Sequence, residues 1–137
     1  MRKEGKASPL PSGGDPFCLA VVRIDTEVIG RVLVVAPHGE LDLHTAEEFK
    51  RVTDRELERA NARHIVVDCS GLTFVDSSGL GAILGRYKKV SQIGGQMVFA
   101  GVPEQTRSIL RLSGILKIIP EHHDPKRAVR CISGVAR

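Results

Sequence analysis

The sequence has few aromatic residues: no tryptophan, one tyrosine and four phenylalanines among 137 residues. It also has no run of basic residues, although its formal net charge is +4. Proteins that bind single-stranded nucleic acids stack the bases on aromatic side chains inside a basic groove. Tyr87 and the phenylalanines are not interleaved with lysine or arginine in that way. The composition therefore gives no support for nucleic-acid binding.

Long hydrophobic runs are also absent. The longest apolar segments, such as Val32–Pro37, fall far short of the roughly 18 residues that a membrane-spanning helix needs. The N-terminus lacks the apolar stretch of a secretory signal, so we expect a cytoplasmic protein without a membrane anchor. Cys18, Cys69 and Cys131 are odd in number and form no C-x-x-C motif, which predicts reduced core cysteines rather than disulfides or a zinc cluster.

The rest of the composition is typical of an ordinary globular domain, with 42% hydrophobic and 26% charged residues. A chain of 137 residues fits one such domain. Residues 1–16 are the exception, because they are rich in glycine, proline, serine and lysine and contain almost nothing apolar. Such a segment cannot offset the entropy lost on ordering. We therefore predict a flexible tail over residues 1–16 and a single domain over residues 17–137.

From residue 17 onward, the hydrophobic pattern predicts strands that alternate with helices. β-Branched runs predict strands over 18–24, 31–37, 64–69, 96–100 and 115–119, with a turn at 27–30, and segment 72–76 leads from a strand end into a helix. Amphipathic segments predict helices over 46–61, about 80–93, 103–113 and 125–132. This order predicts an α/β fold with about four helices and a mixed, mostly parallel sheet of four to five strands. The N-terminal hairpin would form its antiparallel edge.

Two of these helices begin with explicit capping signals. Thr45 and Glu48 have the spacing of a capping box, in which each side chain binds a free amide of the first turn. Asp124 and Pro125 are typical of an N-cap and the first position of the last helix.

The glycine-rich segment after residue 76 does not match a cofactor-binding motif. Gly79, Gly81 and Gly85 have the spacing G-x-G-x-x-x-G instead of the G-x-G-x-x-G of dinucleotide-binding proteins. The sequence has neither a P-loop nor a G-x-S-x-G nucleophile elbow. His122 and His123 are adjacent, so they cannot face one metal as residues four apart on a helix do. We expect no cofactor and no metal site.

Asp76, Ser77 and Ser78 lie between a strand end and a helix start. Each could serve as an N-cap, which stabilises a helix by about 1 kcal/mol, but one cap is enough and at least one hydroxyl would stay on the surface. A helix N-terminus favours negative charge, so the fold could tolerate a phosphate there. A phosphate would add about −1.5 to −2 charge beside Asp76, and near Asp42, and would change any docking surface. The residues alone leave a purely structural role open.

The chain from about Leu19 to Ile132 resembles the STAS-domain family, and within it the bacterial anti-sigma factor antagonists of the sporulation sigma-F branch. The most specific shared motif is Asp76-Ser-Ser-Gly-Leu-Gly81. The other shared segments are Gly39-Glu-Leu-Asp42, His44-Thr-Ala-Glu47, Phe74–Lys88, Gln92–Gly95 and Ser113–Ile119. The departures, Leu43 and the longer tail, lie outside the Asp-Ser-Ser motif.

The resemblance implies a regulatory cycle. In that family, the unphosphorylated antagonist binds an ATP-dependent anti-sigma factor that is also a serine kinase, and thereby frees the sigma factor. The kinase then phosphorylates the first serine of the motif, here Ser77, and a metal-dependent PP2C-type serine phosphatase removes the phosphate. This protein would then be a substrate and a binding module, not an enzyme. The implied partner-binding residues are Glu40, Asp42, Asp76, Ser77, Ser78, Gly79 and Leu80.

Other functions stay open at this point. The closest alternative is an antagonist for a general-stress sigma factor, which only the weaker extended match separates from the sigma-F branch. A stressosome-type scaffold subunit is a second alternative. A nucleotide-sensing module, with a pocket near Ser77, Ser78 and Gly79, is a third.

Overall fold

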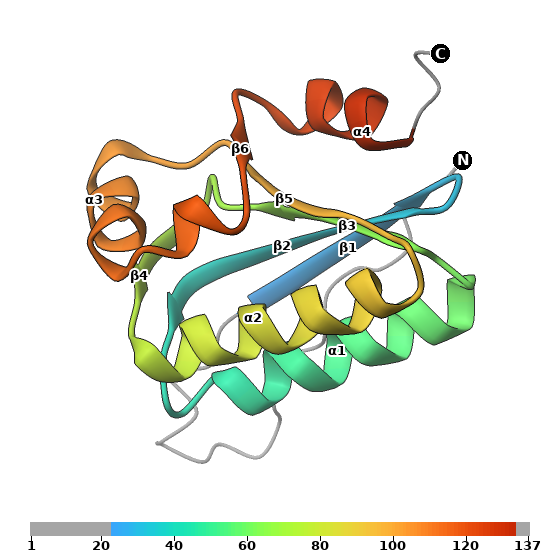
Figure 1. Cartoon of the computed structure of the whole chain (residues 1–137). Helices are drawn as coiled ribbons and strands as arrows, with labels where there is room; N and C mark the ends of the chain where they lie inside the picture. Colours follow the sequence, from blue (N-terminus) through green and yellow to red (C-terminus); the bar gives the residue numbers. More distant parts are fainter. Residues whose placement is uncertain (1–22, 134–137) are drawn as a thin grey trace.

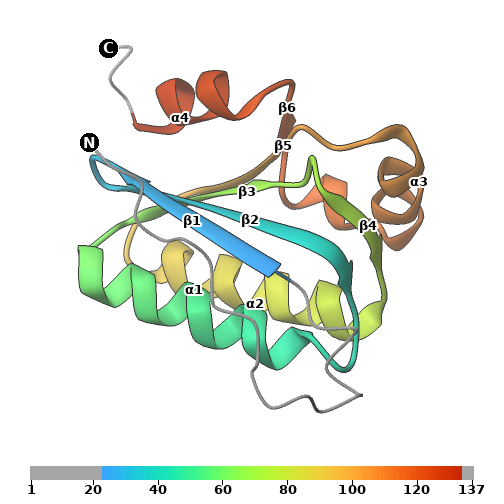
Figure 2. The same ribbon diagram turned by 180° about the vertical axis from the view of Figure 1, so that it is seen from behind.

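The computed structural model describes residues 23–133, which form a mixed sheet with helices on both faces (Figures 1 and 2). The predicted tail over residues 1–16 and the first part of the predicted first strand lie outside the described residues. The elements in chain order are β1 (Arg23–Ile29), β2 (Val32–Leu41), α1 (Ala46–Ala60), β3 (His64–Asp68), β4 (Leu72–Val75), α2 (Ser77–Gln92), β5 (Met97–Ala100), α3 (Glu104–Ser113), the 3-10 helix η2 (Ile115–Lys117), β6 (Glu121–His122) and α4 (Pro125–Ser133).

The sheet order is β1-β2-β3-β5-β6, and β4 pairs with β2 off this path. Only the β1–β2 hairpin is antiparallel, and every other described pair is parallel. The predicted α/β fold, with a mostly parallel sheet and an antiparallel edge, is confirmed. The long strand β2 pairs with β3 through Val32–Val35 and with β4 through Gly39–Leu41, with a register shift at Gly39. β2 therefore carries its C-terminal end to the end of β4, where α2 begins.

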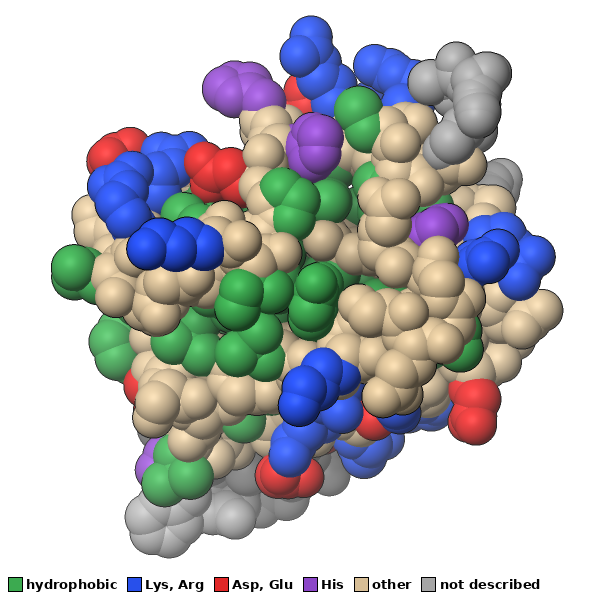
Figure 3. Space-filling model, in the orientation of Figure 1, with side chains coloured by type: hydrophobic (Ala, Val, Ile, Leu, Met, Phe, Trp, Pro, Cys, Tyr) green, Lys and Arg blue, Asp and Glu red, His purple; other side chains and the backbone are tan. Residues whose placement is uncertain are grey.

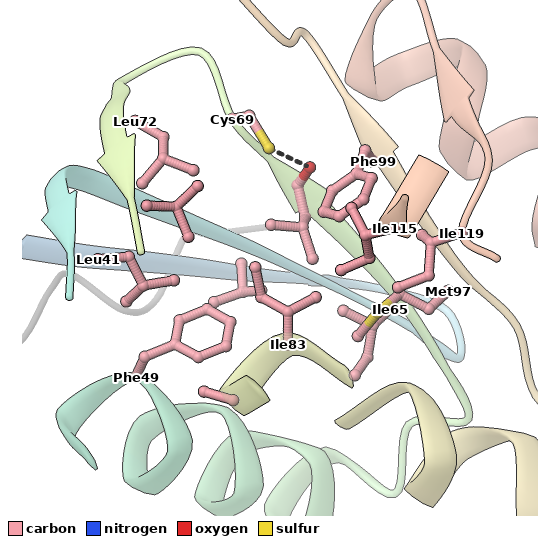
Figure 4. Packing of buried hydrophobic residues seen from close by; sticks show 14 of the residues in the cluster. Leu41, Phe49, Ile65, Cys69, Leu72, Ile83, Met97, Phe99, Ile115 and Ile119 are labelled. Atoms are coloured by element: carbon pink, nitrogen blue, oxygen red, sulfur yellow. Dashed lines mark hydrogen bonds between the residues drawn. The ribbon is translucent and has the colours of Figure 1, made fainter. Parts of the chain in front are cut away.

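The two faces of the sheet are covered unequally. Helices α1 and α2 lie side by side on one face, and α4 crosses the other (Figures 1 and 2). The main core lies under α1 and α2, where Phe49 of α1 and Ile83 of α2 point toward Leu41 and Phe99 of the sheet (Figure 4). A smaller core under α4 contains Val32, Val34, Val66, Val98, Ala100, Ala128, Val129 and Ile132. The fixed position of α2 on the larger core holds its N-terminus at the end of β4.

The predicted strand over 115–119 is wrong. Residues Ile115–Lys117 form the 3-10 helix η2, and β5 pairs instead with the two-residue strand β6. The physical reason is the spacing of the apolar residues. Ile115 and Ile119 are buried, and Ile118 is half exposed. A strand that buried Ile115 and Ile119 would also bury Lys117, because alternate residues of a strand lie on the same face.

The predicted capping box at Thr45 and Glu48 is also wrong. Thr45 does occupy the N-cap position of α1, but its side chain binds no amide of the first turn. Its hydroxyl donates instead to the Glu40 carbonyl oxygen (2.8 Å), and the Glu48 carboxylate pairs with Arg51. Thr45 therefore closes the preceding loop instead of capping the helix.

The cysteine and turn predictions hold in part. Cys69 is buried, donates to the Val67 carbonyl oxygen (3.6 Å), and burial raises the pKa of its thiol far above the ordinary value. Cys131 on α4 is exposed, so the prediction that it is a core residue is wrong, and Cys18 lies outside the described residues.

The turn predicted at 27–30 falls later, because β1 continues to Ile29 and the hairpin reverses between that residue and β2.

Candidate functional site

Asp76 is the N-cap of α2. Its Oδ1 accepts hydrogen bonds from the amides of Ser78 (2.8 Å) and Gly79 (3.1 Å), and its own carbonyl oxygen accepts from the Leu80 amide (2.9 Å). Within residues 23–133, the hydroxyls of Ser77 and Ser78 form no hydrogen bond. The structure therefore separates the three polar residues: Asp76 caps the helix, and both hydroxyls are unused by it.

The two serines differ in exposure. Ser77, the first residue of α2, is exposed, whereas Ser78 is half-buried. Of the other expected site residues, Asp76 and Leu80 are half-buried and Gly79 is buried. Ser77 is therefore the hydroxyl of this motif that another protein can reach most readily.

The loop between β2 and α1 lies against this helix start. The Asp76 amide donates to the Leu41 carbonyl oxygen (3.2 Å), and Oδ2 of Asp76 accepts from the Leu43 amide (3.3 Å). Gly79 is required at this contact, because a Cβ there would overlap the Leu41 carbonyl oxygen. The structure thus brings the 40–43 loop, which contains Asp42, against the Asp-Ser-Ser motif through Leu41 and Leu43.

Asp42 itself organises the loop. Its Oδ1 accepts from the amides of His44 (3.0 Å) and Thr45 (3.2 Å), and its amide donates to the Thr45 hydroxyl (2.9 Å). Its carboxylate has no hydrogen bond to Asp76 or to Ser77 among the described residues. Glu40 is exposed. Both acidic residues lie on the loop that adjoins α2, and Asp42 acts there by fixing the loop's backbone.

Two apolar residues at this end of the molecule were not predicted as site residues. Leu43 is 67% exposed and follows Asp42, and Phe74 is 41% exposed and lies three residues before Ser77. The only sequence signal for Leu43 was that it departs from the family pattern. Exposed apolar side chains therefore accompany the acidic residues on the two segments that meet at the start of α2.

The electrostatic environment of Ser77 within this protein favours an added anion. Ser77 lies at the positive end of the 16-residue helix α2, and the first turn of α2 contains no acidic residue. The opposing charge comes from the Asp76 carboxylate, which three amides hold in place. The described residues contain no group of three or more His, Cys, Asp or Glu that could hold a metal ion. They also contain no helix long and apolar enough to cross a membrane.

Comparison with known proteins identifies the family. The STAS domain model matches residues 23–128. The chain belongs to the STAS-domain family. This STAS protein is 39% identical over 108 residues to the anti-sigma F factor antagonist of Paenibacillus polymyxa, covering 79% of this chain and 92% of that protein. It is 26% identical over 94 residues to an anti-sigma-B factor antagonist of Staphylococcus aureus, covering 69% of this chain and 86% of that one.

Solved structures show the same fold. The anti-sigma factor antagonist SpoIIAA, in its unphosphorylated form, superposes with a TM-score of 0.70 at 23% identity, covering 81% of this chain and 96% of that one. The resemblance to the STAS family and its fold, predicted from the sequence motifs, is thereby confirmed.

Proposed function

We propose that this protein is an anti-sigma factor antagonist that is switched by phosphorylation of Ser77. In its unphosphorylated form it binds an anti-sigma factor, which then releases its sigma factor. The observation that carries the proposal is the Ser77 hydroxyl, which is exposed at the start of α2 and is not needed for the cap, since Asp76 supplies it. The 39% identity to an anti-sigma F factor antagonist supports the same function.

The physics of the switch follows from the site. A phosphate at Ser77 would add about −1.5 to −2 charge, and the positive end of α2 would offset part of it within the protein. A partner that covers Ser77 would have to remove the phosphate from water, together with the neighbouring Asp76 carboxylate. Burying an unpaired charge is strongly unfavourable. Phosphorylation would therefore leave the fold intact and weaken the complex.

We assign the protein to a sigma-F pathway, in the cytoplasm. The identity to the sigma-F antagonist is 39%, against 26% to the sigma-B antagonist. The proposed partners are an anti-sigma factor that is also a serine kinase, and a PP2C-type phosphatase that restores the Ser77 hydroxyl. The proposed contact residues are those expected from the sequence. We add Leu43 and Phe74 because both are exposed, Leu43 next to Asp42 and Phe74 two residues before Asp76 in the chain.

Phosphate mapping tests the acceptor. The full chain is incubated with its cognate anti-sigma kinase and ATP, and the modified residue is located by mass spectrometry. We expect one phosphate, on Ser77, and none in Ser77→Ala. Ser78→Ala is the matched control, because it removes the neighbouring hydroxyl, which is half-buried, and should still be phosphorylated. Phosphate at another residue, or its persistence in Ser77→Ala, would contradict the proposal.

Partner binding tests the consequence. The wild type and Ser77→Asp are compared in a pull-down of the anti-sigma kinase in the presence of ADP, and circular dichroism compares their folds. Ser77→Asp should keep the fold, because a helix start accepts an acidic residue, and should bind the partner more weakly. Equal binding by the two proteins, or a loss of helix signal in Ser77→Asp, would refute this account.

A further inference from the structure

A second site candidate lies at the opposite end of β2 from Ser77. A hollow of about 470 Å³ opens between α4 and the β1–β2 hairpin, within the size range of small-molecule sites. We call it the arginine hollow. Its walls include Ile29, Arg31, Arg63, His64, Val129 and Arg130, and no carboxylate of residues 23–133 lines it.

The three arginines of the hollow lack the ion pairs that several other arginines of the described residues form. Within residues 23–133, six others form ion pairs with carboxylates, namely Arg23, Arg51, Arg55, Arg59, Arg86 and Arg107. None of Arg31, Arg63 and Arg130 has a carboxylate partner in this part of the chain. Arg31 uses only its Nε, which donates to the Asn61 carbonyl oxygen (3.2 Å). Among the described residues, three positive charges therefore line one hollow without a counter-ion.

The backbone brings these side chains together. The carbonyl oxygen of Arg31 accepts from the amides of both Arg63 (2.8 Å) and His64 (3.1 Å), where β2 and β3 begin side by side. Arg130 reaches the same hollow from α4, on the sheet face opposite α1 and α2 (Figure 1). In Figure 3, Lys and Arg side chains and a histidine gather at the right-hand edge, where Figure 1 shows the hairpin.

His64 adds a neutral donor. Its Nδ1 accepts a hydrogen bond from the Gln96 amide (3.1 Å), so the proton of the neutral ring is on Nε2. Burial, then the charges of Arg63 and Arg31, lower the pKa of His64 below its ordinary value, which keeps the ring neutral.

A neighbouring hollow sets the orientation of a ligand. It shares Ile29, Val129 and Arg130 with the arginine hollow, and its other walls carry the carboxylates of Glu27, Asp68 and Asp124 together with Lys126 and Arg127. Charges of both signs therefore offset one another on that side, whereas the end formed by Arg31 and Arg63 carries positive charge alone among the described residues and attracts an anionic group. Apart from Arg130, the shared part is apolar, because Ile29, 43% exposed, and Val129 form it.

We propose that the arginine hollow binds a small organic anion in which a phosphate monoester is joined to an apolar body. Guanidinium groups bind phosphate through paired, charge-assisted hydrogen bonds. The Nε2–H of His64 supplies one more donor, and the apolar body packs on Ile29 and Val129. The site lies away from Ser77 and does not depend on the function proposed for that residue.

Isothermal titration of the full chain with three probes tests the ligand class. Phenyl phosphate carries both parts of the proposed ligand, inorganic phosphate carries the head alone, and phenol carries the body alone. We expect one phenyl phosphate per chain, with affinity that falls as salt is raised. Inorganic phosphate should bind about tenfold more weakly, because it gains no apolar contact, and phenol should not bind. Equal affinity for phenyl phosphate and inorganic phosphate would overturn the apolar half of the proposal.

Substitutions test the location. Arg63→Ala and Arg130→Ala should each weaken phenyl phosphate binding about tenfold or more, since each removes charge-assisted hydrogen bonds. The matched control is Arg111→Ala, which removes an exposed arginine of α3 outside the hollow and should leave the affinity unchanged. Circular dichroism checks that all three variants are folded. An absence of saturable binding, or an equal loss in Arg111→Ala, would overturn the proposal.

Discussion

Replacing glycine by alanine at two positions of α2 should change the free energy of unfolding in opposite directions. Gly79 and Gly81 both lie in the first turns of this helix. A Cβ at Gly81 would meet nothing within 4 Å. A Cβ at Gly79 would overlap the Leu41 carbonyl oxygen and lie 2.8 Å from Cγ2 of Val75. Gly79→Ala and Gly81→Ala therefore share their change in helix propensity and differ in packing.

The magnitudes can be worked out separately. In a helix, alanine is favoured over glycine by about 1 kcal/mol, so Gly81→Ala should raise the free energy of unfolding by about 0.5–1 kcal/mol. At Gly79 the same gain is opposed by overpacking, which costs about 1–3 kcal/mol. The Leu41 carbonyl oxygen cannot move away freely, since it accepts from the Asp76 amide, and losing that bond costs about 1 kcal/mol more. Gly79→Ala should therefore be destabilised by about 1–3 kcal/mol.

Urea denaturation, followed by circular dichroism, measures both variants against the wild type. We expect the two midpoints to move in opposite directions with unchanged m-values, because both proteins unfold the same surface. In thermal denaturation, each 1 kcal/mol corresponds to about 4–8 °C for a domain of about 100 residues. If Gly79→Ala is as stable as Gly81→Ala, the close approach of the 40–43 loop to α2 is refuted.

Four further substitutions, at three positions, test single contacts. Asp76→Ala should lower the free energy of unfolding by about 1–2 kcal/mol through loss of the α2 cap, and Asp76→Asn by less, as thermal denaturation would show. Thr106→Val removes a buried hydroxyl that donates to the Leu72 carbonyl oxygen (2.8 Å), which should cost about 1–3 kcal/mol in urea denaturation. Although burial opposes it, Arg23 is the main partner that holds the pKa of Asp25 below its usual value. Asp25→Asn should therefore lower the free energy of unfolding by less than about 1 kcal/mol at pH 7. The difference in stability between wild type and variant should vanish as the pH falls below about 3.9, the pKa of an unfolded aspartate, and through the lower pKa of the folded protein. A difference that persists at low pH would contradict this.

The order and type of most elements could be predicted from the sequence because local pattern and tertiary burial agree there. In α1, for example, Phe49 and Val52 recur at helical spacing and both are buried. The prediction for 115–119 failed because the β-branched residues favour a strand locally, while the structure buries Ile115 and Ile119 and packs Leu116 partly against the same core. A spacing of four between buried residues was the available signal, and it favours a helical turn.

The sequence indicated which polar residues lie at the start of α2, but not what each of them does there. Capping preferences alone could not choose among Asp76, Ser77 and Ser78, because all three are residue types that cap helices. The choice depends on the extended backbone of Asp76, which aims its carboxylate at the amides of the first turn. The contact of Leu43 with Asp76 was not predictable either, since it joins residues 33 positions apart. Such pairings follow from sheet topology and not from local sequence.

The two oxygens of Asp76 explain why a phosphate on Ser77 would act at the surface and not through the fold. Oδ1 binds two amides of α2, and Oδ2 binds the Leu43 amide of the adjoining loop. Repulsion from a phosphate would have to break all three bonds to displace this carboxylate, whereas an exposed phosphate can turn into water at little cost. The phosphate would move, and Asp76 would stay. We therefore expect the loop and the helix start to keep their geometry in both forms, so that a partner would distinguish them by the charge it meets on an unchanged backbone.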